Sequence, residues 1–320
     1  MNQQWKEFLL GQQATFDSKG RITFLAIGDE RGKCIYVPNH LGILSIVGAD
    51  AAQFLQGQTT CNVHDITPTK ALFAAQCNPK GRVITTFLLL KQDEGFLLVL
   101  PQALLDSVKK RLQMYVLRSK VTLTDSSDQF CLLGLSSSEP PLQPFACHTQ
   151  NGKVSVGISG QQNRQIIIAN PEQAIALWQD HTVNRGFKAA ATATWQYLDI
   201  AAGIPWLDGE TTEAYIPQML NIDKLGGISF NKGCYTGQEI VARTHYLGKA
   251  KRGLFIAKCD SATIPAPNSA VLADNGQAIG NVLAAQLGQN GCLLQIVLGF
   301  PETGMPKLTL ADQTPITLSI

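Results

Sequence analysis

The side chains best suited to chemistry gather in one short segment, Phe230–Arg243, with the sequence FNKGCYTGQEIVAR. Thr236 and Glu239 have the spacing of a capping box, which predicts that a helix begins at Thr236. Cys234 then lies just before the amide-rich end of that helix, and Lys232 adds a positive charge two residues earlier. Both features favour a thiolate, so the sequence predicts that Cys234 is reactive and exposed or half-exposed.

A second interpretation of the same cysteine is structural. Most cytosolic cysteines are small apolar side chains that fill a gap in the core, and Cys234 fits that description as well. The flanking Gly233 and Gly237 favour the reactive interpretation, because they let the backbone bend sharply and approach a ligand. What the thiol reacts with stays open at this point.

The helix predicted behind Cys234 continues into a basic segment, RTHYLGKAKR. It contains Arg243, His245, Lys249, Lys251 and Arg252. Such a segment can contact phosphates of a folded RNA or of an anionic small molecule. The alternative is a solvated connection into the last part of the chain.

The composition of the chain excludes several classes of protein. The 320 residues are 45% hydrophobic and 16% charged with a net charge of +2, too balanced for a general nucleic-acid binder. No P-loop, G-x-G-x-x-G or G-x-S-x-G motif is present, so nucleotide-dependent and serine-hydrolase chemistry have no support. The chain lacks a signal-peptide pattern and an apolar run of ~18 residues, which predicts no membrane span.

The cysteines and histidines argue against a metal site made by this chain alone. No two of the eight cysteines are closer than sixteen residues, and the five histidines form no i, i+4 pair. We therefore expect no metal ligands. Scattered, unpaired thiols are typical of a cytoplasmic protein.

The elements that must position these residues follow from hydrophobic periodicity. Strands are predicted at 42–48, 71–78, 82–90 and 96–100, and helices at 51–56 and 101–118. The turn NPKG should join the second and third strands, since Pro79 and Gly81 supply the required dihedral angles. Only short strand candidates follow Gly248, which predicts a small antiparallel barrel or sandwich.

These patterns divide the chain into parts. We expect residues 1–120 and 191–245 to form one domain, 121–190 an α+β subdomain, and 246–320 a small C-terminal β-barrel.

Several ordered motifs resemble a known family. They are KGCYTGQE at 232–239, GADAAQFLQGQTTCNV at 48–63, CNPKGRV at 77–83, RSKVTL at 118–123, WQYLDIAAGIP at 195–205 and YIPQMLN at 215–221. Together they resemble the YgfZ family of folate-binding proteins, which is related to the glycine-cleavage aminomethyltransferases. The resemblance covers most of the chain from about residue 41 onward.

The resemblance implies an α+β fold: an aminomethyltransferase-like, ring-shaped folate-binding arrangement of ferredoxin-like antiparallel subdomains, with a C-terminal β-barrel. It also implies a helper protein for iron–sulfur cluster assembly or repair, and thereby for tRNA modification. Its partners would be folate and iron–sulfur enzymes or assembly proteins, with tRNA contact through Arg243, Lys249, Lys251 and Arg252. Cys234 would be the central functional residue, assisted by Lys232.

The implied cofactor is tetrahydrofolate or a derivative. By resemblance, the residues that would bind it are Trp195, Leu41, Tyr235, Gly237, Gln238, Glu239, Asn221 and Gln218. Trp195 would lie against the aromatic part of the cofactor.

The chain departs from its enzyme relatives at several positions. Thr85 and Thr86 stand where the aminomethyltransferases have two aspartates, and a neutral hydroxyl cannot manage a proton or steady a cation as a carboxylate does. Ala201 replaces a glutamate that can bind the pterin edge, and Leu41 replaces a tryptophan. These two losses weaken folate binding, and Asp199 is the nearest acid that could substitute.

Three hypotheses follow for function. The first is the folate-binding helper protein that uses Cys234. The second is a folate-dependent one-carbon transferase or demethylase, which Thr85 and Thr86 disfavour. The third is a folate-sensing interaction module whose thiol is incidental. The sequence leaves the client enzyme, the folate form and the oligomeric state open.

Overall fold

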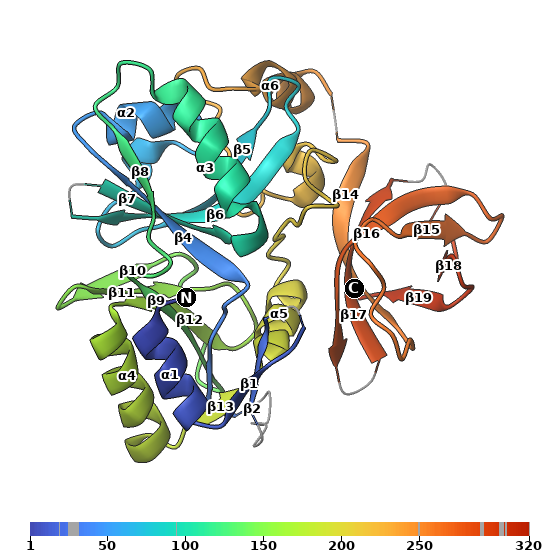
Figure 1. Ribbon diagram of the computed structural model, residues 1–320. Helices are drawn as coiled ribbons and strands as arrows, with labels where there is room; N and C mark the ends of the chain where they lie inside the picture. Colours follow the sequence, from blue (N-terminus) through green and yellow to red (C-terminus); the bar gives the residue numbers. More distant parts are fainter. Residues whose placement is uncertain are drawn as a thin grey trace. The chain divides into compact units, whose positions relative to one another are not determined.

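The computed structural model describes residues 1–18, 20–24, 32–93, 95–248, 250–288, 291–300, 304 and 306–319. The chain, coloured from its N-terminus to its C-terminus in Figure 1, forms two compact units. The first unit contains Met1–Phe54, His64–Leu72 and Leu88–Leu198. The second contains Leu55–Val63, Phe73–Phe87 and Asp199–Ile320.

The helices of the described residues are mostly short. The α-helices are α1 (Gln3–Gly11), α2 (Ala51–Gln56), α3 (Gln102–Val116), α4 (Pro171–Gln179), α5 (Thr192–Ala201) and α6 (Gln238–Tyr246). The other helical turns are the 3-10 helices η1 (Val63–Asp65) and η3 (Pro217–Leu220) and the π-helix η2 (Asp180–Asn184). The sequence predicts an inner stripe of Leu104, Leu105, Val108, Leu112 and Tyr115 for the helix after Pro101. Helix α3 buries the first four, whereas Tyr115 is exposed, so the prediction is wrong at that last position.

A six-stranded sheet organises the first unit. Its order is β10-β11-β12-β9-β3-β13, and only the β13–β3 pair is parallel among the pairings described. The strands are β3 (Cys34–Tyr36), β9 (Cys131–Ser137), β10 (Cys147–Gln150), β11 (Lys153–Gly157), β12 (Asn163–Ala169) and β13 (Lys188–Ala190). A short hairpin, β1 (Ala14–Phe16) and β2 (Ile22–Phe24), belongs to the same unit.

Helices α1 and α4 lie side by side and cover one face of this sheet (Figure 1). Trp5 of α1 meets Trp178 of α4 edge to face with ring centroids 5.8 Å apart, and both rings pack onto Ile35 and Leu133. Burying each of these large side chains contributes about 2–3 kcal/mol, so this cluster is a main source of stability for the unit.

A five-stranded sheet, in the order β5-β6-β7-β4-β8, contains the predicted hairpin. Its strands are β4 (Leu41–Val47), β5 (Leu72–Cys77), β6 (Val83–Gln92), β7 (Gly95–Pro101) and β8 (Thr122–Asp125). The turn between β5 and β6 is closed by Asn78, whose amide donates to the Arg82 carbonyl at 2.8 Å. Gly81 takes a left-handed φ of 69° there, which confirms the predicted turn.

The C-terminal strands close into a barrel in the second unit, as the sequence predicts (orange to red in Figure 1). Its order is β14 (Arg252–Cys259), β17 (Gly291–Gly299), β16 (Ala278–Gly288), β15 (Ala270–Ala273), β18 (Leu308–Leu310) and β19 (Pro315–Leu318), with β19 returning to β14. Strand β19 was not among the predicted strands. The barrel interior is filled by aliphatic side chains such as Val271, Leu294 and Ile296.

Candidate functional site

Cys234 lies in the loop that precedes α6, within the second unit. Its side chain is exposed, whereas Cys147 is half-buried and the other six cysteines are buried. Exposure is the first requirement for a thiol that reacts with a partner, so the prediction of an accessible Cys234 is confirmed.

Lys232 anchors this loop to a neighbouring segment of the same unit, Gly57–Cys61. Its ammonium donates to the carbonyl of Thr59 at 2.7 Å and to that of Cys61 at 2.6 Å. Burial lowers the pKa of Lys232 to about 8. The same ammonium lies 5.0 Å from the centroid of the buried Tyr235 ring. The charge of Lys232 is therefore held by carbonyls and a π-face.

Backbone hydrogen bonds fasten the loop on both sides of Cys234. Upstream, the Ser229 amide donates to the Thr60 carbonyl at 2.9 Å; downstream, the Thr236 amide donates to the Gly57 carbonyl at 3.2 Å. With the two bonds from Lys232, they leave Cys234 as an exposed position on a loop that is fixed at several points.

The predicted start of the following helix is wrong. Helix α6 begins at Gln238, its N-cap is Gly237, and no side chain caps it. The amide of Thr236 is committed to Gly57, and Gly237 takes a left-handed φ of 84°, so the chain cannot enter the helix at Thr236. Gln238 instead accepts a hydrogen bond at Oε1 from the Tyr235 amide at 3.2 Å.

Gly237 is required by a close approach. A methyl group at this position would overlap the Asn78 carbonyl and crowd Gly81, both in the turn between β5 and β6. At Gly81, a methyl group would in turn overlap Ile240 of α6. The two glycines let α6 pack directly on that turn.

Gln218 and Asn221 also belong to the second unit. Gln218 Nε2 donates to the Val241 carbonyl at 2.7 Å, and Asn221 Nδ2 donates to the Leu254 carbonyl at 2.9 Å. These bonds join η3 to α6 and to β14. Gln218 Oε1 is buried and has no hydrogen-bond partner in the described part of the chain.

The two threonines at the aspartate positions are fully buried. Thr85 Oγ1 donates to the Thr86 carbonyl at 3.1 Å, and Thr86 Oγ1 donates to the Pro205 carbonyl at 2.6 Å. Both hydroxyl protons are therefore used in structural bonds, and neither side chain can act as a general acid or base.

Asp199 is the buried acid closest in sequence to Ala201. Its carboxylate accepts a hydrogen bond from Trp206 Nε1 at 3.0 Å, while Ala201 is exposed. Asp199 thus fixes the Trp206 indole, whose ring meets Phe73 edge to face at 4.9 Å.

Trp195 and Leu41 belong to the first unit, so the predicted cofactor residues come from both units. Trp195 is fully buried: Tyr36 lies 5.3 Å from its ring, and the Arg164 guanidinium stacks at 4.3 Å. Its Nε1 is buried without a hydrogen-bond partner among the described residues. Leu41 is buried in β4 opposite Pro101.

The basic segment starts on α6. His245 stacks on Phe230 with centroids 3.7 Å apart and 11° between the planes, and Tyr246 meets both rings edge to face. Arg243, Lys251 and Arg252 are exposed, whereas Lys249 lies outside the described residues. Exposed cations and a cluster of aromatic rings thus follow the Cys234 loop closely in the sequence of the second unit.

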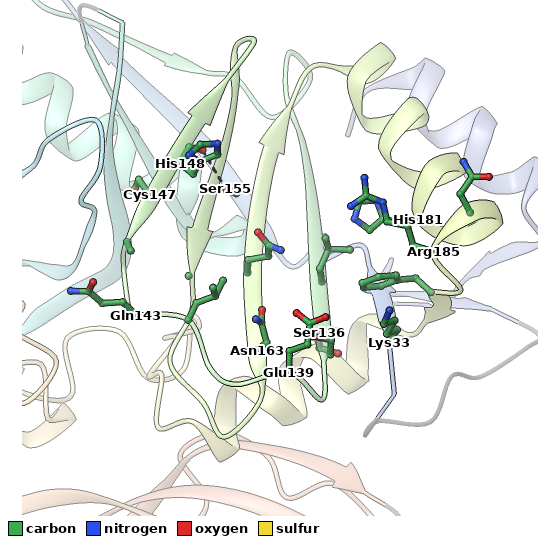
Figure 2. A pocket seen from close by; sticks show the side chains of 18 residues that line it. Lys33, Ser136, Glu139, Gln143, Cys147, His148, Ser155, Asn163, His181 and Arg185 are labelled. Carbon is green, nitrogen blue, oxygen red and sulfur yellow. Dashed lines mark hydrogen bonds between the residues drawn. The ribbon is translucent and has the colours of Figure 1, made fainter.

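A polar groove of about 840 Å³ in the first unit was missed by the sequence analysis. Figure 2 shows Lys33, His181 and Arg185 on one side of its strands, and Gln143, Cys147 and His148 on the other. Arg185 Nε is fixed by the Asp180 carboxylate at 2.7 Å. The lining residues come from separate segments with no common spacing, so no signal in the sequence joins them. None of the predicted site residues lines this groove.

The sequence predicts that this chain has neither metal ligands nor a membrane-spanning segment. Within its residues, no cluster of histidine, cysteine, aspartate or glutamate is arranged to hold a metal ion. Among the described helices, none has the length and apolar character needed to cross a bilayer.

The fold matches that of a known class of protein. Over all of this chain and 97% of the other, it resembles the crystal structure of glycine cleavage system aminomethyltransferase T from Bartonella henselae, with a TM-score of 0.77 at 14% identity. The predicted α+β class with a C-terminal barrel is therefore confirmed. No family model matches the chain.

Curated relatives define the family. The tRNA-modifying protein YgfZ of Colwellia psychrerythraea is 33% identical over 86% of this chain and 88% of its own. That of Photobacterium profundum is 31% identical over 85% of each chain. The chain belongs to the YgfZ family of tRNA-modifying proteins, and the resemblance based on the motifs is confirmed.

Proposed function

We propose that this protein is a folate-binding helper that acts through Cys234 in iron–sulfur cluster assembly or repair, and thereby in tRNA modification. The observation that carries the proposal is the exposed Cys234 thiol on a loop that Lys232 and two backbone bonds hold to Gly57–Cys61. The family name of the relatives supports the link to tRNA modification. The eight free cysteines suit a reducing compartment, so we place the protein in the cytoplasm.

The two threonines at positions 85 and 86 argue against methylene transfer. Thr85 and Thr86 are buried, and both hydroxyls donate to carbonyls. A carboxylate is needed to steady a developing cation or to exchange a proton, and these positions offer none. A folate-dependent transferase or demethylase is therefore the less favoured hypothesis.

Some residues present fit a folate. Gln76 Oε1 and Gln218 Oε1 are buried acceptors without partners among the described residues, and a pterin carries N–H donors that would satisfy such atoms. Tyr235, Gly237, Gln238, Glu239 and Asn221 are further candidates from the same unit. Tetrahydrofolate would supply a one-carbon carrier at the site. Trp195 and Leu41 are further candidates from the first unit.

A complementation test with matched thiol variants decides between the hypotheses. Cells that lack the endogenous protein receive the wild type, Cys234→Ala or Cys147→Ala, and the activity of an iron–sulfur tRNA-methylthiolating enzyme is measured. We expect Cys234→Ala to lose complementation but to keep tetrahydrofolate binding in a titration. Cys147→Ala should behave as wild type in both measurements.

Two other outcomes contradict the proposal. Full complementation by Cys234→Ala together with folate binding would make the protein a folate-sensing module with an incidental thiol. Turnover of tetrahydrofolate with a methylamine donor, surviving the loss of the thiol, would make it a one-carbon enzyme.

We further propose that tRNA contacts the basic segment of the second unit. Arg243, Lys251 and Arg252 can neutralise phosphates, and the exposed Tyr246 can stack on an unpaired base. Replacing these three cations by alanine should weaken binding of unfractionated tRNA and reduce its salt dependence, measured by fluorescence anisotropy. Alanine at Lys109, Lys110 and Lys153 is the control of equal charge, and an equal loss in both variants would contradict a localised contact.

A further inference from the structure

The C-terminal barrel brings two cysteines directly opposite each other on neighbouring strands. Cys259 is the last residue of β14, and its Cα partner on β17 is Cys292. Both side chains belong to the barrel core, together with Ala257 and Leu294. Each thiol affects the pKa of the other, so the two side chains lie near each other. Neither cysteine is among the candidate site residues described above.

The ladder between β14 and β17 fixes their separation. The Phe300 amide donates to the Lys251 carbonyl at 3.0 Å, so these opposed residues form a hydrogen-bonded pair. Pair types alternate along an antiparallel ladder, and Cys259–Cys292 lies an even number of steps further in an unbroken register. It is therefore also a hydrogen-bonded pair, with Cα atoms about 5.5 Å apart. A disulfide spans ~4.4–6.8 Å between Cα atoms, which this pair meets, and ~3.5–4.5 Å between Cβ atoms. Opposed Cβ atoms of a hydrogen-bonded pair lie ~5.5 Å apart, so the bond forms with a small inward shift of the strand end that carries Cys259.

We propose that Cys259 and Cys292 are a reversible disulfide site that locks the barrel under oxidation. A peroxide oxidises one sulfur to a sulfenic acid, its O–O bond breaks, and one molecule of water leaves. The second thiol attacks this sulfur, the S–S bond forms, and a second molecule of water carries away the sulfenic oxygen and the thiol proton. Two electrons pass from the two sulfurs to the peroxide. A dithiol reductant reverses the step by exchange.

The surroundings of the pair set its sensitivity. Burial raises the pKa of both thiols, that of Cys292 to about 11, so little thiolate is present at neutral pH. The single S–H proton of Cys292 is shared between the carbonyls of Ser261 and Thr263, which lie 3.6 and 3.5 Å from Sγ. The chain just beyond Cys259 is mostly exposed, so fraying of this strand end gives the oxidant access. The pair should therefore respond to sustained oxidation and react after the exposed Cys234.

The bond would connect two positions that are adjacent in space and distant along the chain. The loop between Cys259 and Cys292 includes β15 and β16. Closing a loop of this length restricts the unfolded chain. The bond also ties the end of β14 covalently to β17, at the position where Cys259 pairs with Ile316 of β19 on its other side. Oxidation is thus expected to stabilise the barrel.

Peptide mapping of the full-length protein tests the proposal. The wild type is treated with hydrogen peroxide, its remaining thiols are alkylated after denaturation, and the digest is analysed without reduction. We expect a cross-linked peptide that joins Cys259 to Cys292 and disappears with dithiothreitol. Recovery of both residues as alkylated thiols or as sulfinic acids would overturn the proposal, and this readout needs no variant to fold.

Thermal melting provides the second readout. Oxidised wild type should melt about 5–10 °C above the reduced protein, and dithiothreitol should remove the difference. Cys292→Ala and Cys259→Val should show no shift, whereas Cys131→Ala, a buried thiol in the first unit, should keep it. A cross-link without a shift in melting would overturn the locking role. Cys234 is unchanged in all these proteins, so the outcome is independent of the proposed function.

Discussion

Lys232 is the side chain that anchors the loop carrying Cys234, alongside two backbone hydrogen bonds. Lys232 donates two hydrogen bonds to the carbonyls of Thr59 and Cys61, and Cys234 stays exposed two residues further on. We infer that Lys232 is a positioning residue, since its ammonium is held by these carbonyls. Its side chain determines where the thiol is presented.

The half-buried ammonium of Lys232 predicts a specific dependence of stability on pH. Its pKa falls from an ordinary value near 10.5 to about 8 in the folded protein. Between these two values the unfolded state binds more protons, so the contribution of Lys232 to the free energy of unfolding rises with pH and is lost as pH falls through 8. Urea denaturation from pH 7 to 10 should show the wild type gaining stability relative to Lys232→Met. A constant gap between the two proteins would contradict this expectation.

The exposure of Cys234 predicts the order in which the cysteines are alkylated. Iodoacetamide applied to the folded protein should alkylate Cys234 first, because the remaining cysteines are half-buried or buried. Mass spectrometry of timed samples locates the adduct, and Cys234→Ser should lack the fast phase. Initial alkylation at Cys147 would show that the Cys234 loop is shielded in solution.

At the scale of elements, α6 and the turn between β5 and β6 depend on each other. Gly237 has a left-handed backbone, and a side chain there would overlap the Asn78 carbonyl. Gly237→Ala should lower the free energy of unfolding by about 1–3 kcal/mol, measured in urea. Gly233→Ala is the matched control in the same motif, because a methyl group there meets nothing within 4 Å. Equal losses at both glycines would contradict the packing argument.

The sequence predicted regular elements better than their junctions. Periodicity located α3, the β5–β6 hairpin and most of the barrel, because these elements repeat apolar residues over many positions. The capping box at Thr236 failed, since the Gly57 carbonyl, far away in the sequence, takes the Thr236 amide. The anchoring role of Lys232 could not be predicted for the same reason: its partners are long-range carbonyls that any residue can supply. The division into 1–120 with 191–245, 121–190 and 246–320 stays a prediction.

At the scale of the whole molecule, the second unit is assembled from three separate stretches of chain. The Cys234 loop, its anchor Gly57–Cys61 and the C-terminal barrel all belong to it. The candidate site around Cys234 and the barrel core are therefore expected to unfold together, with a free energy of unfolding distinct from that of the first unit.

Hydrogen exchange measures this separation. Ile296→Ala creates a cavity in the barrel core and should cost about 2–5 kcal/mol. It should speed exchange at the amides of Ser229 and Thr236 more than at Ile166 of the first unit. Ile35→Ala, equally buried in the first unit, should produce the reverse pattern. Uniform acceleration in both variants would indicate a single cooperative body.

The discontinuous second unit also has a consequence during synthesis. The ribosome makes Gly57–Cys61 about 170 residues before the loop that binds it, a wait of roughly 9–35 s at elongation rates of ~5–20 residues per second. Throughout that interval the carbonyls of Thr59 and Cys61 lack the Lys232 ammonium, which later donates a hydrogen bond to each of them. A nascent chain arrested before residue 232 should therefore be a substrate for chaperones, and completion of the thiol loop should release it.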